Sequence, residues 1–318
     1  MARIGILDDY QEVSLKMADW SIISQGNDVQ VFKDHLSDPD AVVNRLKEFD
    51  VVVAMRERTP FPRSILAQLP NLKLLVTTGM RNRSVDMEAS AELGITVCGT
   101  SGQSYATAEL TWGLILSLAR CIPAEDAATR QGKWQVTVGE GLKSKTLGVL
   151  GLGNLGSQVA TVGNAFGMNV VAWSQNLTEE RAAQFGTTLV SKEELLSTAD
   201  IVTIHLILSQ RTRGLLGAKE LALLKPTAYL VNTSRGPIVD EAALVDVLER
   251  GAIGGAAMDV FDEEPLPVDH PLRRMENTVI TPHLGYVTKE TYLNYFGQAV
   301  EDIQAFLAGE PVRVLEAV

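Results

Sequence analysis

A glycine-rich stretch at residues 145–156 limits the possible folds of this chain more than any other part of the sequence. It reads KTLGVLGLGNLG, so an apolar run leads into Gly151-x-Gly153-x-x-Gly156, and a helix-compatible segment of low charge follows. In a strand–loop–helix unit, the first glycine makes a tight turn, the second admits phosphates to the backbone, and the third lets helix and strand pack closely. Glycines also gather in ordinary turns, but backbone N–H groups at a helix start attract a pyrophosphate. The stretch therefore predicts a dinucleotide-binding loop.

The composition is that of an ordinary globular protein with an acidic balance. Of the 318 residues, 46% are hydrophobic and 21% are charged, and 28 basic against 39 acidic side chains give a net charge of −11. This length is sufficient for two domains with hydrophobic cores. An acidic chain without a basic patch is a poor candidate for binding nucleic acid or an anionic membrane.

Nothing in the sequence predicts secretion, a membrane span or a metal site. The N-terminus, MARIGILDDY, places acids directly after a short apolar run, unlike a signal peptide. The longest apolar run, residues 110–119, is too short to cross a bilayer. Cys98 and Cys121 are isolated thiols without the spacing of metal ligands. We therefore expect a cytoplasmic protein without a bound metal.

Strands and helices are predicted to alternate along both halves of the chain. In the first hundred residues, strands are expected at 3–7, 29–32, 51–54, 72–77 and 95–97, with helices at 40–48 and 86–93. After one long helix at 101–120 and the glycine loop, strands are expected at 169–173, 201–206, 228–232, 256–260 and 278–281, with helices at 178–185, 192–197, 219–224 and 241–250. A final helix is expected at 289–307. The pattern predicts an α/β protein whose second part is a six-stranded doubly wound sheet.

Three side chains that could do chemistry each follow one of the last three predicted strands. Arg235 stands in TSRGP, Glu264 in FDEEP and His283 in PHLG. Ligands of an open α/β sheet bind beyond the carboxyl ends of its strands, so these residues could converge. A guanidinium can hold a carboxylate, a histidine can move a proton, and a carboxylate can fix its tautomer. Taken singly, each could equally be a loop ion pair, a solvated acid or a packed histidine.

These segments resemble the D-isomer-specific 2-hydroxyacid dehydrogenase family, which includes glyoxylate/hydroxypyruvate reductases and phosphoglycerate dehydrogenases. The resemblance rests on GLGNLG, NTSRGPIVDEAAL, AAMDVFDEEPLP and TPHLGY, and it is weaker at residues 55–59 and 72–79. It implies hydride transfer between NAD or NADP and a small D-2-hydroxyacid or 2-oxoacid. It also implies that Arg235 binds the substrate and polarises its carbonyl group, that His283 is the acid/base, and that Glu264 is its partner.

The resemblance further implies a discontinuous fold. A Rossmann cofactor domain at residues 100–285 would be inserted in a smaller flavodoxin-like substrate domain, formed by residues 1–99 and 286–318, with hinges near Thr100 and Gly285. The expected cofactor contacts are Gly151, Gly153, Asn154, Leu155, Gly156, Ser174, His205, Thr233, Thr107 and Asp259, the last at the nicotinamide carboxamide. The expected substrate contacts are Arg56, Arg58, Thr78, Gly79 and Met80. A homodimer is implied through the apolar helix at 106–119, although simple burial explains its composition equally well.

The sequence departs from the NAD pattern at the second strand of the cofactor domain. NAD selectivity usually depends on an acid there that bonds the ribose 2′-OH, but Ser174 stands in its place. Serine removes the repulsion of a 2′-phosphate, yet Gln175 and Asn176 offer no positive charge to hold one. The choice between NAD and NADP stays open, with a slight preference for tolerance of NADP.

Alternatives from other classes also remain. An NAD(H)-binding corepressor-like sensor could keep the same three residues. A formate-type dehydrogenase would carry glutamine in place of Glu264. A methyltransferase would leave the three strand-end residues unexplained. The sequence does not identify the substrate, and glyoxylate, hydroxypyruvate, other 2-oxoacids and 3-phosphoglycerate all stay open.

Overall fold

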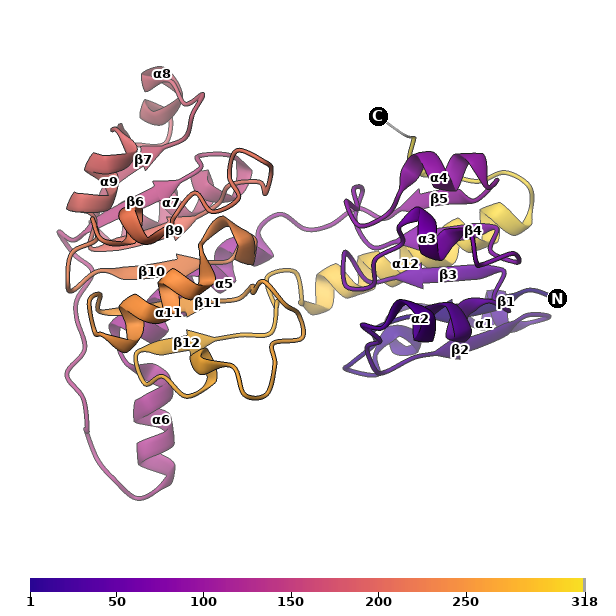
Figure 1. Cartoon of the computed structure of the whole chain (residues 1–318), viewed down its shortest axis with the longest axis horizontal. Coiled ribbons are helices and arrows are strands. Elements are labelled where there is room, and N and C mark those ends of the chain that lie inside the picture. Colours follow the sequence, from indigo (N-terminus) through magenta and orange to yellow (C-terminus); the bar gives the residue numbers. More distant parts are fainter. Residues whose placement is uncertain (317–318) are drawn as a thin grey trace. The chain divides into compact units, whose positions relative to one another are not determined.

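The computed structural model describes residues 1–316 and divides into two compact units. Unit 1 comprises Met1–Gln103 and the chain from Val287 onward, and unit 2 comprises Ser104–Tyr286. Each unit is built around its own parallel sheet with helices packed on it (Figure 1). This confirms the predicted α/β fold class, because strands that alternate with helices form parallel sheets covered on both faces.

Unit 1 contains a five-stranded parallel sheet in the order β2-β1-β3-β4-β5. The interior strands β3 and β4 are buried along their whole length, which explains their largely apolar runs VVVA and LLVT. The reversal of strand order after β1 is the flavodoxin-like doubly wound arrangement. The strands are β1 (Arg3–Ile6), β2 (Asp28–Val31), β3 (Val51–Ala54), β4 (Leu74–Thr77) and β5 (Thr96–Gly99).

The longest helix of unit 1 comes from the C-terminal end of the chain. Thr288 caps the start of this helix, α12 (Lys289–Leu307), and its apolar face packs against β4. The buried side chains of that face include Tyr292, Tyr295 and Phe296. The other helices of unit 1 are α1 (Ser21–Ser24), α2 (Pro39–Leu46), α3 (Arg63–Leu66) and α4 (Met87–Glu92). The short helices α1 and α3 were not predicted from sequence.

Unit 2 contains a seven-stranded parallel sheet in the order β12-β11-β10-β9-β6-β7-β8. The predicted number of six was wrong, because the two-residue strand β8 adds an edge next to β7. So short a segment has no alternation from which a strand could be read. The strands are β6 (Thr146–Leu150), β7 (Asn169–Trp173), β8 (Thr188–Leu189), β9 (Ile201–Ile204), β10 (Tyr229–Asn232), β11 (Gly255–Met258) and β12 (Thr278–Ile280).

The helix predicted at residues 101–120 was wrong at its start, and the helix that follows it was not predicted. The structure has a shorter helix, α5 (Ala106–Ala119), followed by a second helix, α6 (Ile122–Arg130). Cys121 between them adopts the left-handed conformation with φ 51°, and a proline in the first turn of α6 marks the new start. The remaining helices of unit 2 are α7 (Asn154–Ala165), α8 (Glu179–Ala183), α9 (Lys192–Thr198), α10 (Ala218–Leu221) and α11 (Glu241–Glu249).

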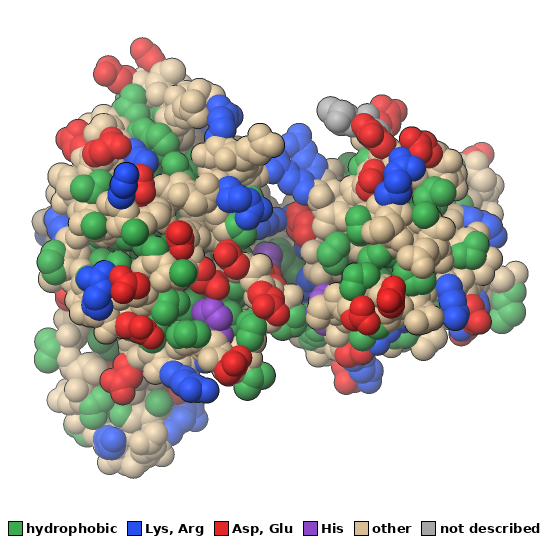
Figure 2. Space-filling model, in the orientation of Figure 1, with side chains coloured by type: hydrophobic (Ala, Val, Ile, Leu, Met, Phe, Trp, Pro, Cys, Tyr) green, Lys and Arg blue, Asp and Glu red, His purple; other side chains and the backbone are tan. Residues whose placement is uncertain are grey.

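Charged side chains of both signs are spread over the surface that Figure 2 presents. On this face of the described residues, no basic patch extends across either unit. None of the helices described in the structure has the length and apolar character that a membrane crossing would need.

Candidate active site

The glycine loop joins β6 to α7 with the geometry that a dinucleotide requires. Gly151 has φ +99°, and a Cβ atom there would lie 2.7 Å from the carbonyl oxygen of His205. A Cβ atom on Gly156 would lie 1.9 Å from the carbonyl oxygen of Gly151, so helix and strand pack closely only with glycine here. A Cβ atom on Gly153 would meet no atom within 4 Å, so this face of the loop is open. The three glycines thus fit a pyrophosphate at the start of α7.

The strand order places two further loops beside the glycine loop. Because β7 and β9 pair with β6 on its two sides, the loops after them flank the loop after β6. Ser174 directly follows β7, and His205 directly follows β9. These carboxyl ends are where open α/β sheets bind their ligands.

His205 is a neutral histidine in this setting. Its Nε2 lies 2.9 Å from the Thr203 hydroxyl, whereas its buried Nδ1 has no hydrogen-bond partner among the described residues. Burial lowers the pKa of His205 to about 4, so the imidazole is uncharged near neutral pH. A buried ring nitrogen with unused hydrogen-bonding capacity is compatible with the cofactor contact expected here, which stays a prediction.

His283 and Glu264 meet at the far side of the same sheet edge. The Nδ1 atom of His283 lies 2.6 Å from Oε2 of Glu264, and Oε1 of Glu264 accepts a hydrogen bond from the Phe261 N–H at 2.9 Å. Burial raises the pKa of Glu264, but the hydrogen bond and charge of His283, the Phe261 N–H and the charge of Arg235 outweigh it and lower that pKa. The carboxylate is therefore ionised near neutral pH, and its bond fixes which ring nitrogen of His283 faces away.

Asp259 holds the turn that carries His283. The turn needs such support because His283 itself has φ +56°, a conformation that few non-glycine residues adopt. The fully buried carboxylate of Asp259 accepts hydrogen bonds from the Thr281 hydroxyl at 2.6 Å, the Leu284 N–H at 2.7 Å and the Gly285 N–H at 2.9 Å. Burial raises the pKa of Asp259 despite these bonds. The expected contact with the nicotinamide carboxamide stays a prediction, beside this structural role.

Arg235 follows the neighbouring strand β10 and belongs to the same group. The buried Asn232 side chain donates to the Arg235 carbonyl oxygen at 2.9 Å and accepts from the Ser234 N–H at 3.0 Å. This loop packs directly on the loop after β11, because a Cβ atom on Gly236 would lie 2.2 Å from the carbonyl carbon of Phe261. Since β10, β11 and β12 are neighbours, Arg235, Glu264 and His283 all lie at one edge of the sheet.

Two threonines expected at the cofactor are tied into unit 2. The Thr107 hydroxyl donates to the Gly285 carbonyl oxygen at 2.9 Å. The Thr233 hydroxyl lies 2.9 Å from the hydroxyl of buried Thr111. These bonds connect α5 to the loops after β10 and β12. Asn154 and Leu155 form the first turn of α7, as the glycine-loop pattern requires.

The expected substrate residues cluster in unit 1 after β3 and β4. Arg56, with φ +51°, donates from Nη1 to the Thr78 carbonyl oxygen at 3.2 Å, and its guanidinium fills the space beside Gly79. Arg58 donates to the Asp8 carbonyl oxygen at 2.9 Å. Two N–H groups of the backbone cradle expected at residues 78–80 already donate within unit 1. The Thr78 N–H donates to the Ala54 carbonyl oxygen, and the Gly79 N–H donates to the Thr100 hydroxyl. Met80 is partly exposed.

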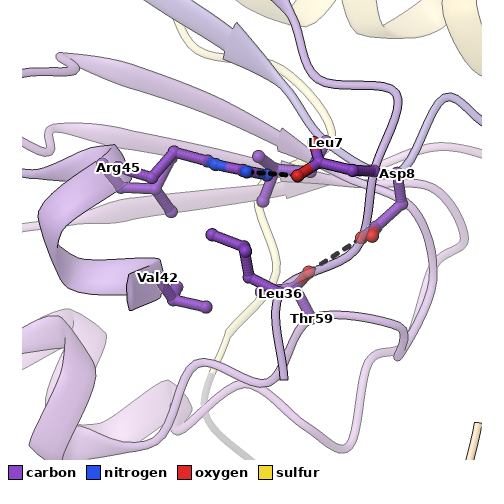
Figure 3. A pocket seen from close by; sticks show the side chains of 8 residues that line it. Leu7, Asp8, Leu36, Val42, Arg45 and Thr59 are labelled. Carbon is purple, nitrogen blue, oxygen red and sulfur yellow. Dashed lines mark hydrogen bonds and ion pairs between the residues drawn. The ribbon is translucent and has the colours of Figure 1, made fainter. Parts of the chain in front are cut away.

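Unit 1 also contains a small pocket of about 210 Å³ that includes open solvent (Figure 3). The Asp8 carboxylate at its wall accepts from the Thr59 hydroxyl at 2.8 Å and lies 2.9 Å from Nδ1 of His35. Arg45 on α2 pairs with Asp34 at 2.5 Å. No sequence pattern pointed to this cluster, and its polar groups bind one another.

One side chain near the glycine loop also escaped sequence reasoning. Arg211, in the loop after β9, donates from Nη1 to Oε1 of Gln175 at 3.1 Å. The two residues are 36 positions apart. Only the strand order, in which β7 and β9 flank β6, brings their loops together.

Comparisons with known proteins agree with this geometry. The family model for the NAD-binding domain of D-isomer-specific 2-hydroxyacid dehydrogenases matches residues 112–285. A glyoxylate reductase of Aeropyrum pernix is 38% identical over 300 residues, covering 91% of this chain and 89% of the relative. A D-3-phosphoglycerate dehydrogenase of Synechocystis sp. is 36% identical over 98% of this chain, which spans only 55% of that relative.

A solved structure shows the same overall fold. The phosphoglycerate oxidoreductase of Vibrio cholerae superimposes with a TM-score of 0.92 at 38% identity, covering 97% of this chain and 100% of the other. The glycine loop, the strand-end residues and these relatives lead to one assignment. The chain belongs to the D-isomer-specific 2-hydroxyacid dehydrogenase family, whose members are NAD-dependent oxidoreductases.

Proposed function

We propose that this chain interconverts a small D-2-hydroxyacid and its 2-oxoacid, with His283 as the acid/base, Glu264 as its partner and Arg235 as the substrate-binding residue. The observation that carries the proposal is the 2.6 Å contact between His283 and an ionised Glu264. It lies at the sheet edge that also holds the open face of the glycine loop. Membership of the family supports the reaction type.

The proton chemistry follows from the geometry of the histidine. Because Nδ1 of His283 faces Glu264, Nε2 is the atom that can exchange a proton with substrate. In reduction, protonated His283 gives the Nε2 proton to the carbonyl oxygen, and Glu264 stabilises the imidazolium before transfer. When bound, the reduced nicotinamide supplies the hydride to the carbonyl carbon, so that the oxoacid becomes the hydroxyacid. Oxidation of the hydroxyacid reverses these transfers.

Arg235 supplies the positive charge that this reaction needs. A guanidinium beside the carbonyl oxygen stabilises negative charge that develops there, and it can also hold the substrate carboxylate bidentately. The packing of its loop on the loop of Glu264 keeps the charge near the acid/base pair. We assign cofactor binding to unit 2 and substrate contacts to unit 1, through Arg56, Arg58, Thr78, Gly79 and Met80.

Among the open substrates, we favour a small 2-oxoacid such as glyoxylate over 3-phosphoglycerate. Glu57 stands between the two candidate arginines and lies 3.6 Å from Nε of Arg56, which weakens a phosphate site there.

Oxidation of NADH and NADPH in the presence of a panel of 2-oxoacids tests the proposal. We expect turnover with glyoxylate, hydroxypyruvate or a related 2-oxoacid, and its loss in Arg235→Ala. Cofactor binding without turnover of any 2-oxoacid would favour the corepressor-like sensor instead. In a parallel assay with NAD⁺, oxidation of formate without turnover of any 2-oxoacid would favour the formate-type branch, which the carboxylate of Glu264 argues against.

We also propose a homodimer in the cytoplasm. Apolar side chains in the segment after α6 are exposed within the single chain, with Trp134 at 79% and Val138 at 96%. Exposed apolar groups of this size commonly mark an interface between proteins. Light scattering of the purified protein would measure the mass, and a monomer at micromolar concentration would contradict the dimer.

A further inference from the structure

The loop after β9 reaches across the end of β6 to the loop after β7. Arg211 in the first loop donates to the Gln175 side chain in the second at 3.1 Å. The glycine loop lies between these two loops in the strand order. In a dinucleotide-binding sheet, the loop after the second strand receives the ribose of the adenosine. Arg211 therefore lies beside the place where a ribose 2′ substituent would lie.

The backbone that carries Arg211 is held firmly, although its side chain is exposed. The Thr212 hydroxyl donates to the Ile207 carbonyl oxygen at 2.7 Å and accepts from the Ser209 N–H at 2.8 Å. The Gly214 N–H donates to the Pro237 carbonyl oxygen at 2.8 Å, which connects this loop to the segment after β10. The guanidinium thus projects from a fixed turn. Its Gln175 partner is neutral and can be displaced by an anion without loss of an ion pair.

The groups around this position favour an anion over a bare hydroxyl. Ser174 occupies the end of β7, where an acid would bond the ribose 2′-OH and repel a 2′-phosphate. The nearest acids along the chain, Glu179 and Glu180, begin α8 and are exposed to solvent. Two further arginines serve other groups: Arg181 donates to Gln184 at 2.9 Å and lies 4.5 Å from the ring of Phe185, and the charge of Arg213 acts on Asp262.

We propose that Arg211, together with Ser174 and Gln175, binds the 2′-phosphate of NADPH and makes this chain prefer NADPH to NADH. A guanidinium is the side chain best suited to hold a phosphate through two parallel hydrogen bonds, and a serine hydroxyl can donate a third. The inference rests on the proposed cofactor site at the glycine loop. It also corrects the sequence-based view that no positive charge is available here.

Direct binding measurements on the full chain test the inference without relying on turnover. The fluorescence of reduced nicotinamide reports NADPH and NADH, and calorimetry reports 2′,5′-ADP and 5′-AMP, a pair that differs only in the 2′-phosphate. We expect tighter binding of NADPH and of 2′,5′-ADP than of their partners. Arg211→Ala should weaken these two by about tenfold to a hundredfold, the usual effect of one charge-assisted phosphate contact.

The matched variants separate the possible roles of the side chain. Arg211→Lys should keep most of the NADPH preference, and Arg181→Ala should leave it unchanged. An equal loss for NADPH and NADH in Arg211→Ala would mean that the guanidinium stacks on the adenine, which would overturn the inference. Unchanged binding of both cofactors would overturn it as well. If the wild-type chain bound neither cofactor, the cofactor site itself, and hence the proposed function, would fail first.

Discussion

Each unit of this protein contains one histidine bonded through Nδ1 to a carboxylate, but the two pairs have different surroundings. In unit 2, His283 and Glu264 lie 2.6 Å apart, with side chains 20% and 32% exposed. In unit 1, His35 and Asp8 lie 2.9 Å apart, with side chains 9% and 1% exposed. The second carboxylate is also used by the Thr59 hydroxyl, whereas the Glu264 oxygens accept only from His283 and one backbone N–H among the described residues.

Pairing with a carboxylate is therefore not sufficient to assign a histidine to catalysis. The buried Asp8 carboxylate, which also accepts from the Thr59 hydroxyl, holds its surroundings in place, because an unsatisfied buried charge would destabilise the fold. A carboxylate that is partly exposed and lies near Arg235 can instead support a proton transfer to something outside the chain. Both pairs follow strand ends, so their position in the sheet does not distinguish them. The exposure of each carboxylate and its other neighbours distinguish the two pairs.

Removing the His283 side chain in unit 2 should give the largest effect. We expect His283→Ala to lower kcat by roughly 10²–10⁴, the usual contribution of a general acid, with cofactor binding nearly unchanged. Steady-state kinetics with the best 2-oxoacid and fluorescence titration of the cofactor measure the two quantities. A loss of less than about threefold in kcat, well below that usual contribution, would remove the functional distinction between the two histidine pairs.

A charge placed in the open glycine turn extends the comparison to the cofactor loop. Gly153 precedes α7 as its N-cap with φ −81° and open space beside it, so aspartate should fit and cap the helix. We expect Gly153→Asp to weaken NADH and NADPH alike by about a hundredfold, through repulsion of the pyrophosphate. Gly153→Asn is the uncharged control. Equal binding by the two variants would show that the phosphates do not lie at this turn.

Removing the histidine of unit 1 should affect stability and not turnover. His35→Ala leaves one oxygen of the buried Asp8 carboxylate without its partner. We expect the free energy of unfolding to fall by about 1–3 kcal/mol, the usual result for a buried group left unsatisfied. Urea denaturation measures the loss, and kcat of the folded fraction is the control. A large fall in kcat at unchanged stability would give the two histidines equivalent roles.

The smallest expected effect concerns the pH profile. The hydrogen bond and charge of His283 lower the pKa of Glu264, so the ionised carboxylate favours the charged imidazolium in return. Glu264→Gln removes that negative charge, and protonated His283 becomes less stable. The pH optimum for reduction should therefore move downward, on the order of one pH unit. If the kcat profile did not move, Glu264 would have no influence on the proton of His283.

The sequence was most informative where one short motif determines both structure and chemistry. The glycine loop predicted a strand, a turn and a helix, and Gly151 and Gly156 have the tight geometry that those positions require. Arg235, Glu264 and His283 could be grouped because neighbouring parallel strands end at one edge of a sheet. The strands of unit 1 could be found in the same way, since buried parallel strands are short apolar runs.

Features that depend on contacts between distant segments could not be predicted. Arg211 contacts Gln175 because β7 and β9 lie on the two sides of β6, and Asp8 contacts His35 because β1 and β2 are neighbours in their sheet. The separate helix α6 begins after the left-handed Cys121, a conformation that cysteine does not signal. The edge strand β8 is too short for any periodic pattern. The contacts of Arg211 and Asp8 are tertiary, whereas sequence patterns report local preferences.

The return of α12 to unit 1 has a consequence for synthesis of the protein. The ribosome completes all of unit 2 before the segment from Val287 onward, so the first unit emerges without its last helix. Until then, the surface of β4 that Tyr295, Phe296 and their neighbours cover is left open to water. An uncovered apolar surface on a nascent chain attracts chaperones and other chains. Unit 2 can therefore complete its fold during synthesis before unit 1, although the synthesis of unit 1 begins first.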